Sequence, residues 1–196
     1  MKQIAFFDFD GTITTKDTLL EFIKYSKGNF RFCFGFLVNS PFLVAYKIGL
    51  LSNQRAKEKI LSFFFGKKKI QLFQQYCDDF ADTIIPGLIR PKALHEIRQL
   101  QARGIDVVIL SASAENWLEK WCRLNNISLI ATKLERNQDV LTGKIAGLNC
   151  YGKEKVRRIH EVYDLEEYNC VYAYGDTKGD KPFLALATFS FYKPFR

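Results

Sequence analysis

Two aspartates stand directly after a short apolar run near the start of the chain, in Ile4-Ala-Phe-Phe-Asp8-Phe-Asp10-Gly-Thr12. A run of this length and composition predicts a strand buried in a parallel sheet that is covered on both faces. Alternation along a strand would turn Asp8 and Asp10 the same way, and Gly11 lets the chain leave the sheet sharply. Two like charges so close are costly unless a cation or a shared proton offsets them. The pattern therefore indicates a Mg²⁺ site beside a carboxylate nucleophile, although Asp-x-Asp alone also fits a solvated strand end.

The second half of the chain alternates apolar strands with helices. We expect strands at 105–110, 128–131 and 170–174, helices at 92–103, 115–125, 153–163 and 182–186, and a final edge strand at 189–192. A hairpin of 133–134 with 140–145, across Asn137-Gln138-Asp139, interrupts this order. Such alternation predicts an α/β fold with a mostly parallel sheet, which binds ligands at the carboxyl ends of its strands.

A helical insertion separates the first strand from this regular part. Thr18-Leu-Leu-Glu21 fits a capping box that opens a helix, and Gly28-Asn29 fits its end. Two further helices are expected at 53–65 and 67–84. We therefore predict a core domain formed by 1–13 and 89–196, and a helical cap domain formed by 14–88.

The stretch 30–51 within this insertion is unusually apolar. Its alternating phenylalanines suggest a strand, yet the whole is too apolar for a half-exposed one. The uncharged run 32–46 is broken by Asn39-Ser40-Pro41 and is shorter than the roughly 20 residues needed to span a bilayer. Two interpretations stay open: the core of the helical cap, or an apolar surface that contacts lipid or a lipid-like substrate. Phe63-Phe64-Phe65 beside Lys67-Lys68-Lys69 likewise fits either an interfacial anchor or a buried helix end before a charged start.

The amino-acid composition limits which binding partners and which cellular compartment can be expected for this protein. The formal net charge of +8 favours anionic partners, but the basic residues are scattered, so no nucleic acid is expected. Five cysteines, odd in number and without metal-ligand spacing, indicate reduced thiols in a cytosolic protein. Because the first strand begins at once, we expect no signal peptide. We predict a cytoplasmic protein, with peripheral contact at the inner face of the membrane as an extension of that prediction.

Further candidate residues follow later strands or open a helix. Ser111 comes directly after the strand Val107–Leu110, where a hydroxyl and backbone N–H groups can hold phosphate oxygens, although a serine there is most often a helix cap. Gly175-Asp176-Thr-Lys-Gly-Asp180 places two more carboxylates after another strand, which fits Mg²⁺ better than calcium. Lys153 and Lys155 open a helix, where lysine is unfavourable against the helix dipole.

Together these four motifs resemble the haloacid dehalogenase superfamily, in particular its phosphoserine-phosphatase-like branch, subfamily IB. That resemblance implies a Rossmann-like core with a C1-type helical cap inserted after the first strand. It implies that Asp8 is the nucleophile that forms an aspartyl-phosphate, and that Asp10 acts as general acid and then base. Ser111 would bind the phosphoryl group, and Lys155 would neutralise charge on Asp8 and the phosphate. Lys155 is preferred to Lys153 because it fits the branch's Gly-x-x-Lys-Val pattern.

The resemblance also implies a metal site and a substrate site. Mg²⁺ would be held by Asp8, the carbonyl of Asp10 and Asp176, with Asp180 in support. The substrate contacts that we expect beyond the catalytic residues are Thr12, Asp17, Ala112 and Ser113.

The predicted function is Mg²⁺-dependent hydrolysis of a phosphomonoester through the aspartyl-phosphate. The apolar cap resembles that of bacterial phosphatidylglycerophosphate phosphatases, so the substrate is expected to be a lipid phosphate of that kind or a small phosphorylated metabolite. Ordinary phosphoserine phosphatases have Gly-Gly where this chain has Ala112-Ser113, which argues against phosphoserine. The alternative is a non-catalytic protein on the same fold that binds a membrane or nucleic acid.

Overall fold

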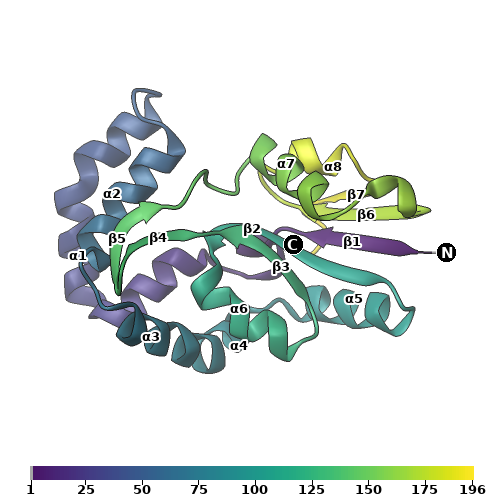
Figure 1. Ribbon diagram of the computed structural model, residues 1–196, viewed down its shortest axis with the longest axis horizontal. Coiled ribbons are helices and arrows are strands. Elements are labelled where there is room, and N and C mark those ends of the chain that lie inside the picture. Colours follow the sequence, from purple (N-terminus) through teal and green to yellow (C-terminus); the bar gives the residue numbers. More distant parts are fainter. Residues whose placement is uncertain (1) are drawn as a thin grey trace.

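A five-stranded parallel sheet forms the centre of the computed structural model, which describes residues 2–196 (Figure 1). Its strands lie in the order β3-β2-β1-β6-β7, so that the first strand of the chain is the central one. Their bounds are Gln3–Phe7 for β1, Asp106–Ala114 for β2, Ser128–Thr132 for β3, Cys170–Gly175 for β6 and Phe189–Tyr192 for β7. All four pairings are parallel, which confirms the predicted α/β class and the final edge strand.

Helices cover both faces of this sheet, as the unbroken apolar strands predicted. Ala5 and Phe7 of β1 point into a core shared with one pair of helices, whereas Ile4 and Phe6 point into a core shared with the other. In Figure 1 the first pair lies below the sheet and the second pair above it. The first pair is α5 (Pro91–Ala102) and α6 (Glu115–Leu124), and the second is α7 (Lys153–Val162) and α8 (Lys181–Leu184).

The inserted helices gather at the end of the sheet where β1 finishes (Figure 1). They are α1 (Thr18–Lys47), α2 (Asn53–Phe65), α3 (Ile70–Thr83) and the short α4 (Ile85–Leu88). Phe22 of α1 lies at the centre of their packing, stacked on Trp117 with ring centroids 5.0 Å apart. Three further rings contact Phe22 at centroid distances of 5.3–5.5 Å, namely those of Phe65, Phe73 and Phe80. Aromatic packing therefore joins the inserted helices to α6.

Helix α1 differs from the sequence prediction at both ends. Its N-cap is Asp17, whose carboxylate accepts the N–H of Leu20, so the cap lies one residue before the predicted Thr18. The chain bends at Gly28 (φ +78°) and then resumes the helix, so the expected end there is a kink. The helix also continues through Pro41, whose missing N–H leaves the Leu37 carbonyl free. The Ser40 hydroxyl donates to that carbonyl at 2.7 Å and so replaces the lost bond.

The stretch 30–51 packs against the core on one face of α1 and is exposed on the other, so contact with lipid stays a prediction. On one face Phe32 and Phe36 pack against the core, and the buried Asn39 side chain donates to the Gly35 carbonyl. The other face is exposed, with Phe30 84% and Leu37 72% accessible. We call this exposed face, together with two exposed apolar residues that directly follow the helix, the apolar face of α1; it consists of Phe30, Phe34, Leu37, Val38 and Val44, and then Ile48 and Leu50. In the described part of the chain, no helix combines the length and the apolar character that crossing a membrane would require.

The predicted hairpin is present but lies apart from the main sheet. Its strands β4 (Leu134–Asn137) and β5 (Val140–Ile145) pair antiparallel, and β5 contacts α2. Backbone bonds of 2.8 and 2.9 Å join Leu141 to Lys67 and Lys68. Gly143 lies so close to α2 that an added Cβ would stand 2.3 Å from the Cα of Ser62. The hairpin therefore braces the inserted helices, while the division into domains 1–13 plus 89–196 and 14–88 stays a prediction.

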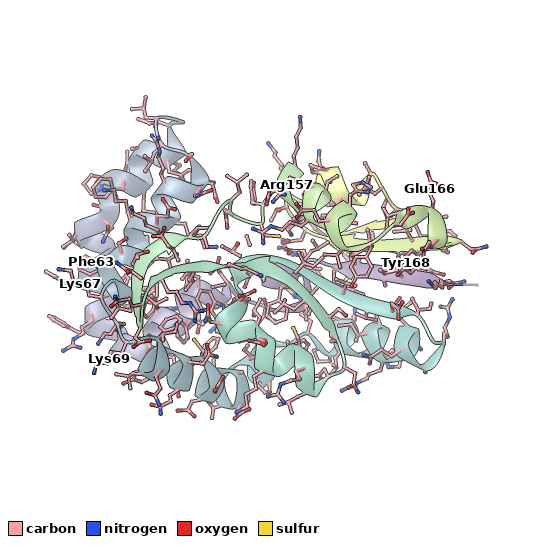
Figure 2. All side chains as sticks on the ribbon, in the orientation of Figure 1. Phe63, Lys67, Lys69, Arg157, Glu166 and Tyr168 are labelled. Carbon is pink, nitrogen blue, oxygen red and sulfur yellow. The ribbon has the colours of Figure 1, made fainter. Side chains whose placement is uncertain are left out.

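The residues of the phenylalanine triplet 63–65 and the lysine triplet 67–69 lie partly in the core and partly at the surface. Phe64 and Phe65 are buried, and Phe63 is 45% exposed. Phe63, Lys67 and Lys69 all lie at the helical end of the molecule (Figure 2). Two short turns complete the chain, η1 (Phe9–Ile13) directly after β1 and η2 (Leu165–Glu167) before β6.

Candidate active site

A buried lysine joins two of the predicted carboxylates. Lys155, in the first turn of α7, places its ammonium 2.6 Å from Asp8 Oδ1 and 2.7 Å from Asp180 Oδ1. The residue is 1% exposed, whereas Lys153, its rival in the sequence prediction, lies at the surface. A lysine at a helix start is unfavourable against the helix dipole, and the two carboxylates explain why this one is present.

Three carboxylates meet at the ends of β1 and β6. Oxygens of Asp8, Asp176 and Asp180 all lie within 4.8 Å of one another, and all three residues are buried. The Thr12 hydroxyl lies 3.0 Å from Asp8 Oδ2 and 3.2 Å from Asp176 Oδ1, and can donate to either. Burial raises the pKa of Asp8 to about 7, even though Lys155 lowers it, and burial also raises the pKa of Asp176. The negative charge of the three carboxylates is therefore only partly compensated by the nearby cations. Hard carboxylate oxygens of this kind suit Mg²⁺.

Two glycines allow these loops to approach one another. Gly11 has φ +82°, and a Cβ added there would stand 2.7 Å from Asp176 Oδ2. A Cβ on Gly175 would stand 2.6 Å from the Cβ of Asp180. The loop after β6 is closed by Asp180 Oδ2, which accepts the N–H groups of Asp176 and Thr177 at 3.2 and 2.9 Å. Burial opposes ionisation of Asp180, but Lys155 and Thr177 outweigh it and hold the pKa of Asp180 below its usual range.

The Asp10 side chain is held by hydrogen bonds from Thr18 and Ser113. Its Oδ1 accepts both the N–H and the hydroxyl of Thr18 at 2.7 Å, and its Oδ2 accepts the Ser113 hydroxyl at 2.6 Å. The carboxylate is thereby fixed facing the neighbouring cavity. A metal contact through the Asp10 carbonyl, as the family resemblance implies, stays a prediction.

Two of the expected substrate contacts do not line that cavity. Ser111 is fully buried and its hydroxyl accepts the Ser113 N–H at 3.0 Å, and Thr12 is buried between Asp8 and Asp176. The other three do line it: Ala112, Ser113 and Asp17. Burial and, to a smaller extent, the charge of Asp10 together raise the pKa of Asp17 to about 6. The roles of all five residues stay predictions.

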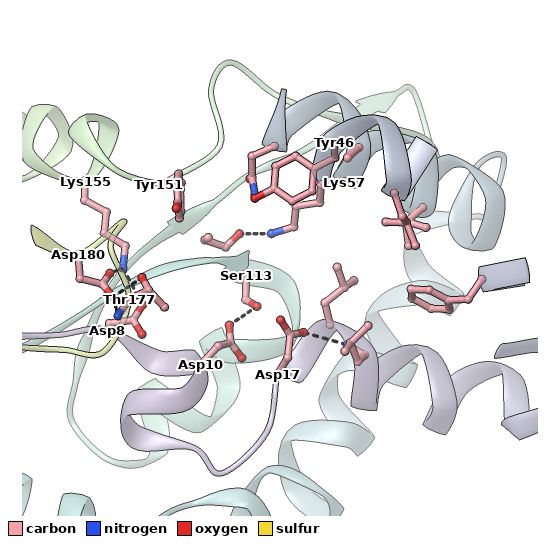
Figure 3. Close-up of a pocket in the computed structure, with 18 residues that line it drawn as sticks. Asp8, Asp10, Asp17, Tyr46, Lys57, Ser113, Tyr151, Lys155, Thr177 and Asp180 are labelled. Carbon is pink, nitrogen blue, oxygen red and sulfur yellow. Dashed lines mark hydrogen bonds and ion pairs between the residues drawn. The ribbon is translucent and has the colours of Figure 1, made fainter. Parts of the chain in front are cut away.

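The cavity has a volume of about 310 Å³ and two unlike ends (Figure 3). Asp8, Lys155 and Asp180 lie at one end of the view, with Asp10 and Ser113 beside them. The other end is mostly apolar and comes from the inserted helices, through Leu19, Leu20, Phe36, Leu43, Tyr46, Ala56 and Ile60. The cavity therefore joins a charged end to an apolar end that the inserted helices form.

Sequence reasoning missed several residues around this site. Lys57 of α2 lines the cavity and donates to the Ala112 carbonyl at 2.5 Å. Tyr151 and Thr177 line it as well. Arg196 forms an ion pair with Asp176, and the neighbouring Phe195 ring stacks on Tyr174 with centroids 5.8 Å apart. No local pattern marks these residues, because tertiary packing alone brings them to the site.

Known proteins with similar sequences and structures identify the family of this chain. The chain is 35% identical over 192 residues to protein CicA of Caulobacter vibrioides, covering 97% of this chain and 85% of that protein. It is 26% identical to a histidinol-phosphatase of Neisseria meningitidis, covering 96% and 88%. A substrate-bound phosphoserine phosphatase structure superposes with a TM-score of 0.70 at 17% identity, covering 98% and 86%. The family of haloacid dehalogenase-like hydrolases matches residues 5–185. The chain therefore belongs to the haloacid dehalogenase-like hydrolases.

Proposed function

We propose that this hydrolase cleaves phosphomonoesters through an aspartyl-phosphate on Asp8. The observation that carries the proposal is the buried Asp8–Lys155 pair, 2.6 Å apart, at the end of a cavity that also presents Asp10. The names of its relatives, a histidinol-phosphatase and a phosphoserine phosphatase, support a phosphate ester as substrate.

In the first step, a carboxylate oxygen of Asp8 attacks phosphorus as the bond to the leaving oxygen breaks. Lys155 holds Asp8 in place and offsets negative charge on the phosphoryl oxygens. Asp10, held by Thr18 and Ser113, donates a proton to the leaving oxygen. The products are the free alcohol and the aspartyl-phosphate.

In the second step, Asp10 accepts a proton from water, whose oxygen attacks phosphorus. The bond from phosphorus to Asp8 breaks, which frees inorganic phosphate and restores the carboxylate. Asp8 and Asp176, with Asp180 beside them, are the residues that would hold Mg²⁺. The ion would supply positive charge against the phosphoryl oxygens.

Activity should depend on Mg²⁺. After treatment with a chelator, phosphate release from para-nitrophenyl phosphate should fall to background, because the buried carboxylates would then repel the anionic substrate. Added Mg²⁺ should restore it, and Ca²⁺ should inhibit, since Ca²⁺ prefers more ligands and looser geometry. A metal titration measures both effects. Full activity in excess chelator would contradict the metal site.

The apolar half of the cavity supports a lipid phosphate or another phosphomonoester with an apolar leaving group. Residues of α1 and α2 supply this half, and it lies beside Asp10, the expected proton donor to the leaving oxygen. Burial of apolar surface contributes about 25 cal/mol per Å². The leaving group therefore provides binding energy that an inorganic phosphate lacks.

The apolar face of α1 supports a second proposal, contact with an anionic membrane surface. Monomeric proteins rarely leave so many large apolar side chains exposed on one helix without an interaction partner. Exposed Arg31 and Lys47 lie on the same helix, and Lys67 and Lys69 lie near it at the helical end (Figure 2). Apolar residues flanked by cations are typical of peripheral binding to anionic lipids.

The double variant Phe30→Ser, Leu37→Ser should lose this contact. Burial of each side chain in the interface would contribute about 1.5–3 kcal/mol to the binding free energy. We therefore expect at least a tenfold weaker association with anionic vesicles. Co-sedimentation measures it, and the thermal melt should be unchanged because both side chains are exposed. Leu124→Ser is the matched control, since Leu124 is 61% exposed on α6. Equal binding by all three proteins would contradict a membrane-facing cap.

A further inference from the structure

Lys57 places a second cation in the cavity, and no carboxylate within residues 2–196 lies within ion-pair distance of it. Its ammonium donates to the Ala112 carbonyl. Lys155, the other lysine of the cavity, is already paired with Asp8 and Asp180. Burial lowers the pKa of Lys57, although the charges of Asp10 and Asp17 act against this.

An ammonium without an ion-pair partner in a partly apolar cavity is costly, and a bound anion offsets that cost. Ammonium has three N–H donors, so Lys57 can keep its bond to Ala112 and still donate to a ligand. The apolar neighbours Ala56 and Ile60, on the same helix, line the cavity beside it. Lys57 is thus a charged anchor within the pocket of the cap.

The position of Lys57 separates it from the phosphoryl group. In Figure 3, Asp8, Lys155 and Asp180 lie together at one end of the cavity, and Lys57 lies with Tyr46 well away from them. Asp10, the expected proton donor to the leaving oxygen, lies between the two groups in this view. A ligand whose phosphorus is next to Asp8 therefore directs its leaving group, and not its phosphoryl oxygens, toward Lys57.

We propose that Lys57 binds a second anionic group, carried by the leaving group of the substrate. The preferred substrates are then phosphomonoesters whose alcohol portion combines an apolar part with a negative charge. This inference rests on the proposed phosphatase function and adds a specificity-determining residue from the cap.

A pair of esters that differ by one carboxylate tests the proposal. Phenyl phosphate and 3-carboxyphenyl phosphate share an aromatic leaving group, and only the second carries the additional charge. For Lys57→Met, which keeps the apolar stem, kcat/KM for the carboxylated ester should fall at least tenfold more than for phenyl phosphate. The loss should be mainly in KM, because the contact exists in both ground and transition states. Lys57→Arg should retain part of the preference, since it keeps the charge.

Lys59→Met is the matched control. Lys59 lies on the same helix but is exposed, with its ammonium 5.0 Å from the centre of the Phe42 ring. The kcat/KM values of Lys59→Met for the two esters should match those of the unaltered enzyme. Thermal melts show whether each variant is folded at the assay temperature.

An inhibition experiment provides a second measurement. Inhibition by benzoate should weaken in Lys57→Met, whereas inhibition by phenol should not.

Three results would overturn the inference. Equal losses on the two esters would show that Lys57 acts on the phosphoryl group or on the fold, and unchanged rates on both would show that it binds neither. In these two cases the phosphatase function itself would stand. Absence of phosphate release from both esters by the unaltered enzyme would overturn the proposed function, and the inference with it.

Discussion

Replacing Asp8 with asparagine should lower phosphate release on the order of a thousandfold or more, as loss of a nucleophile does in other hydrolases. An amide cannot attack phosphorus, so the covalent step has no substitute. The fold should survive, because burial already raises the pKa of Asp8 to about 7 and a neutral amide avoids the buried charge. The assay is phosphate release from para-nitrophenyl phosphate in saturating Mg²⁺, with a thermal melt of each protein.

Asp106→Asn provides the matched control for that experiment. Asp106 is exposed at the start of β2, at the opposite end of the sheet from Asp8. The same change of carboxylate to amide should leave its rate unaltered. Hydrolysis by Asp8→Asn at even a tenth of the normal rate would rule out Asp8 as the nucleophile.

Replacing Lys155 with alanine should lower turnover about a hundredfold or more, the size of effect seen when one preorganised electrostatic group is removed. Its ammonium contacts Asp8 and is 1% exposed, so water cannot replace it readily. Lys153→Ala, two residues away at the surface, should change the rate little. Steady-state kinetics on the same ester compare the two variants directly.

Stability has to be measured alongside the Lys155 rates. Without the Lys155 ammonium, Asp8 and Asp180 would be left as buried charges. Removing one partner of a buried ion pair lowers the free energy of unfolding by about 3–5 kcal/mol. The assays should therefore be run below the melting temperature of each variant. A large loss for Lys153→Ala with none for Lys155→Ala would reverse the assignment of the motif lysine.

The residues that sequence could predict are those fixed by strand geometry. Asp8 and Asp176 each follow an apolar strand, and the carboxyl ends of neighbouring parallel strands share one edge of the sheet. Their convergence with Asp180 therefore follows from the pattern of elements. Lys155 was predicted from its unfavourable place at a helix start together with the family motif.

The residues that sequence could not predict depend on packing between distant segments. Lys57 looks like any charged residue of an amphipathic helix, and only the position of α2 over the end of β2 places it in the cavity. The kink of α1 also escaped prediction, because a glycine in a helix ends some helices and bends others. Here the segment before the kink packs through Phe22 on Phe65 and Trp117, and the segment after it packs through Phe36 on Phe64, which favours the bend.

The contact between Arg196 and Asp176 has a practical consequence for producing the protein. Phe195 stacks on Tyr174 and positions the Arg196 guanidinium against a carboxylate of the expected metal site. An affinity tag fused after Arg196 would disturb that side chain and alter the charge at the expected metal site. A tag placed before β1 would emerge at the end of the strands that lies away from the inserted helices (Figure 1). Amino-terminal fusions are therefore the format in which metal dependence and turnover should be compared.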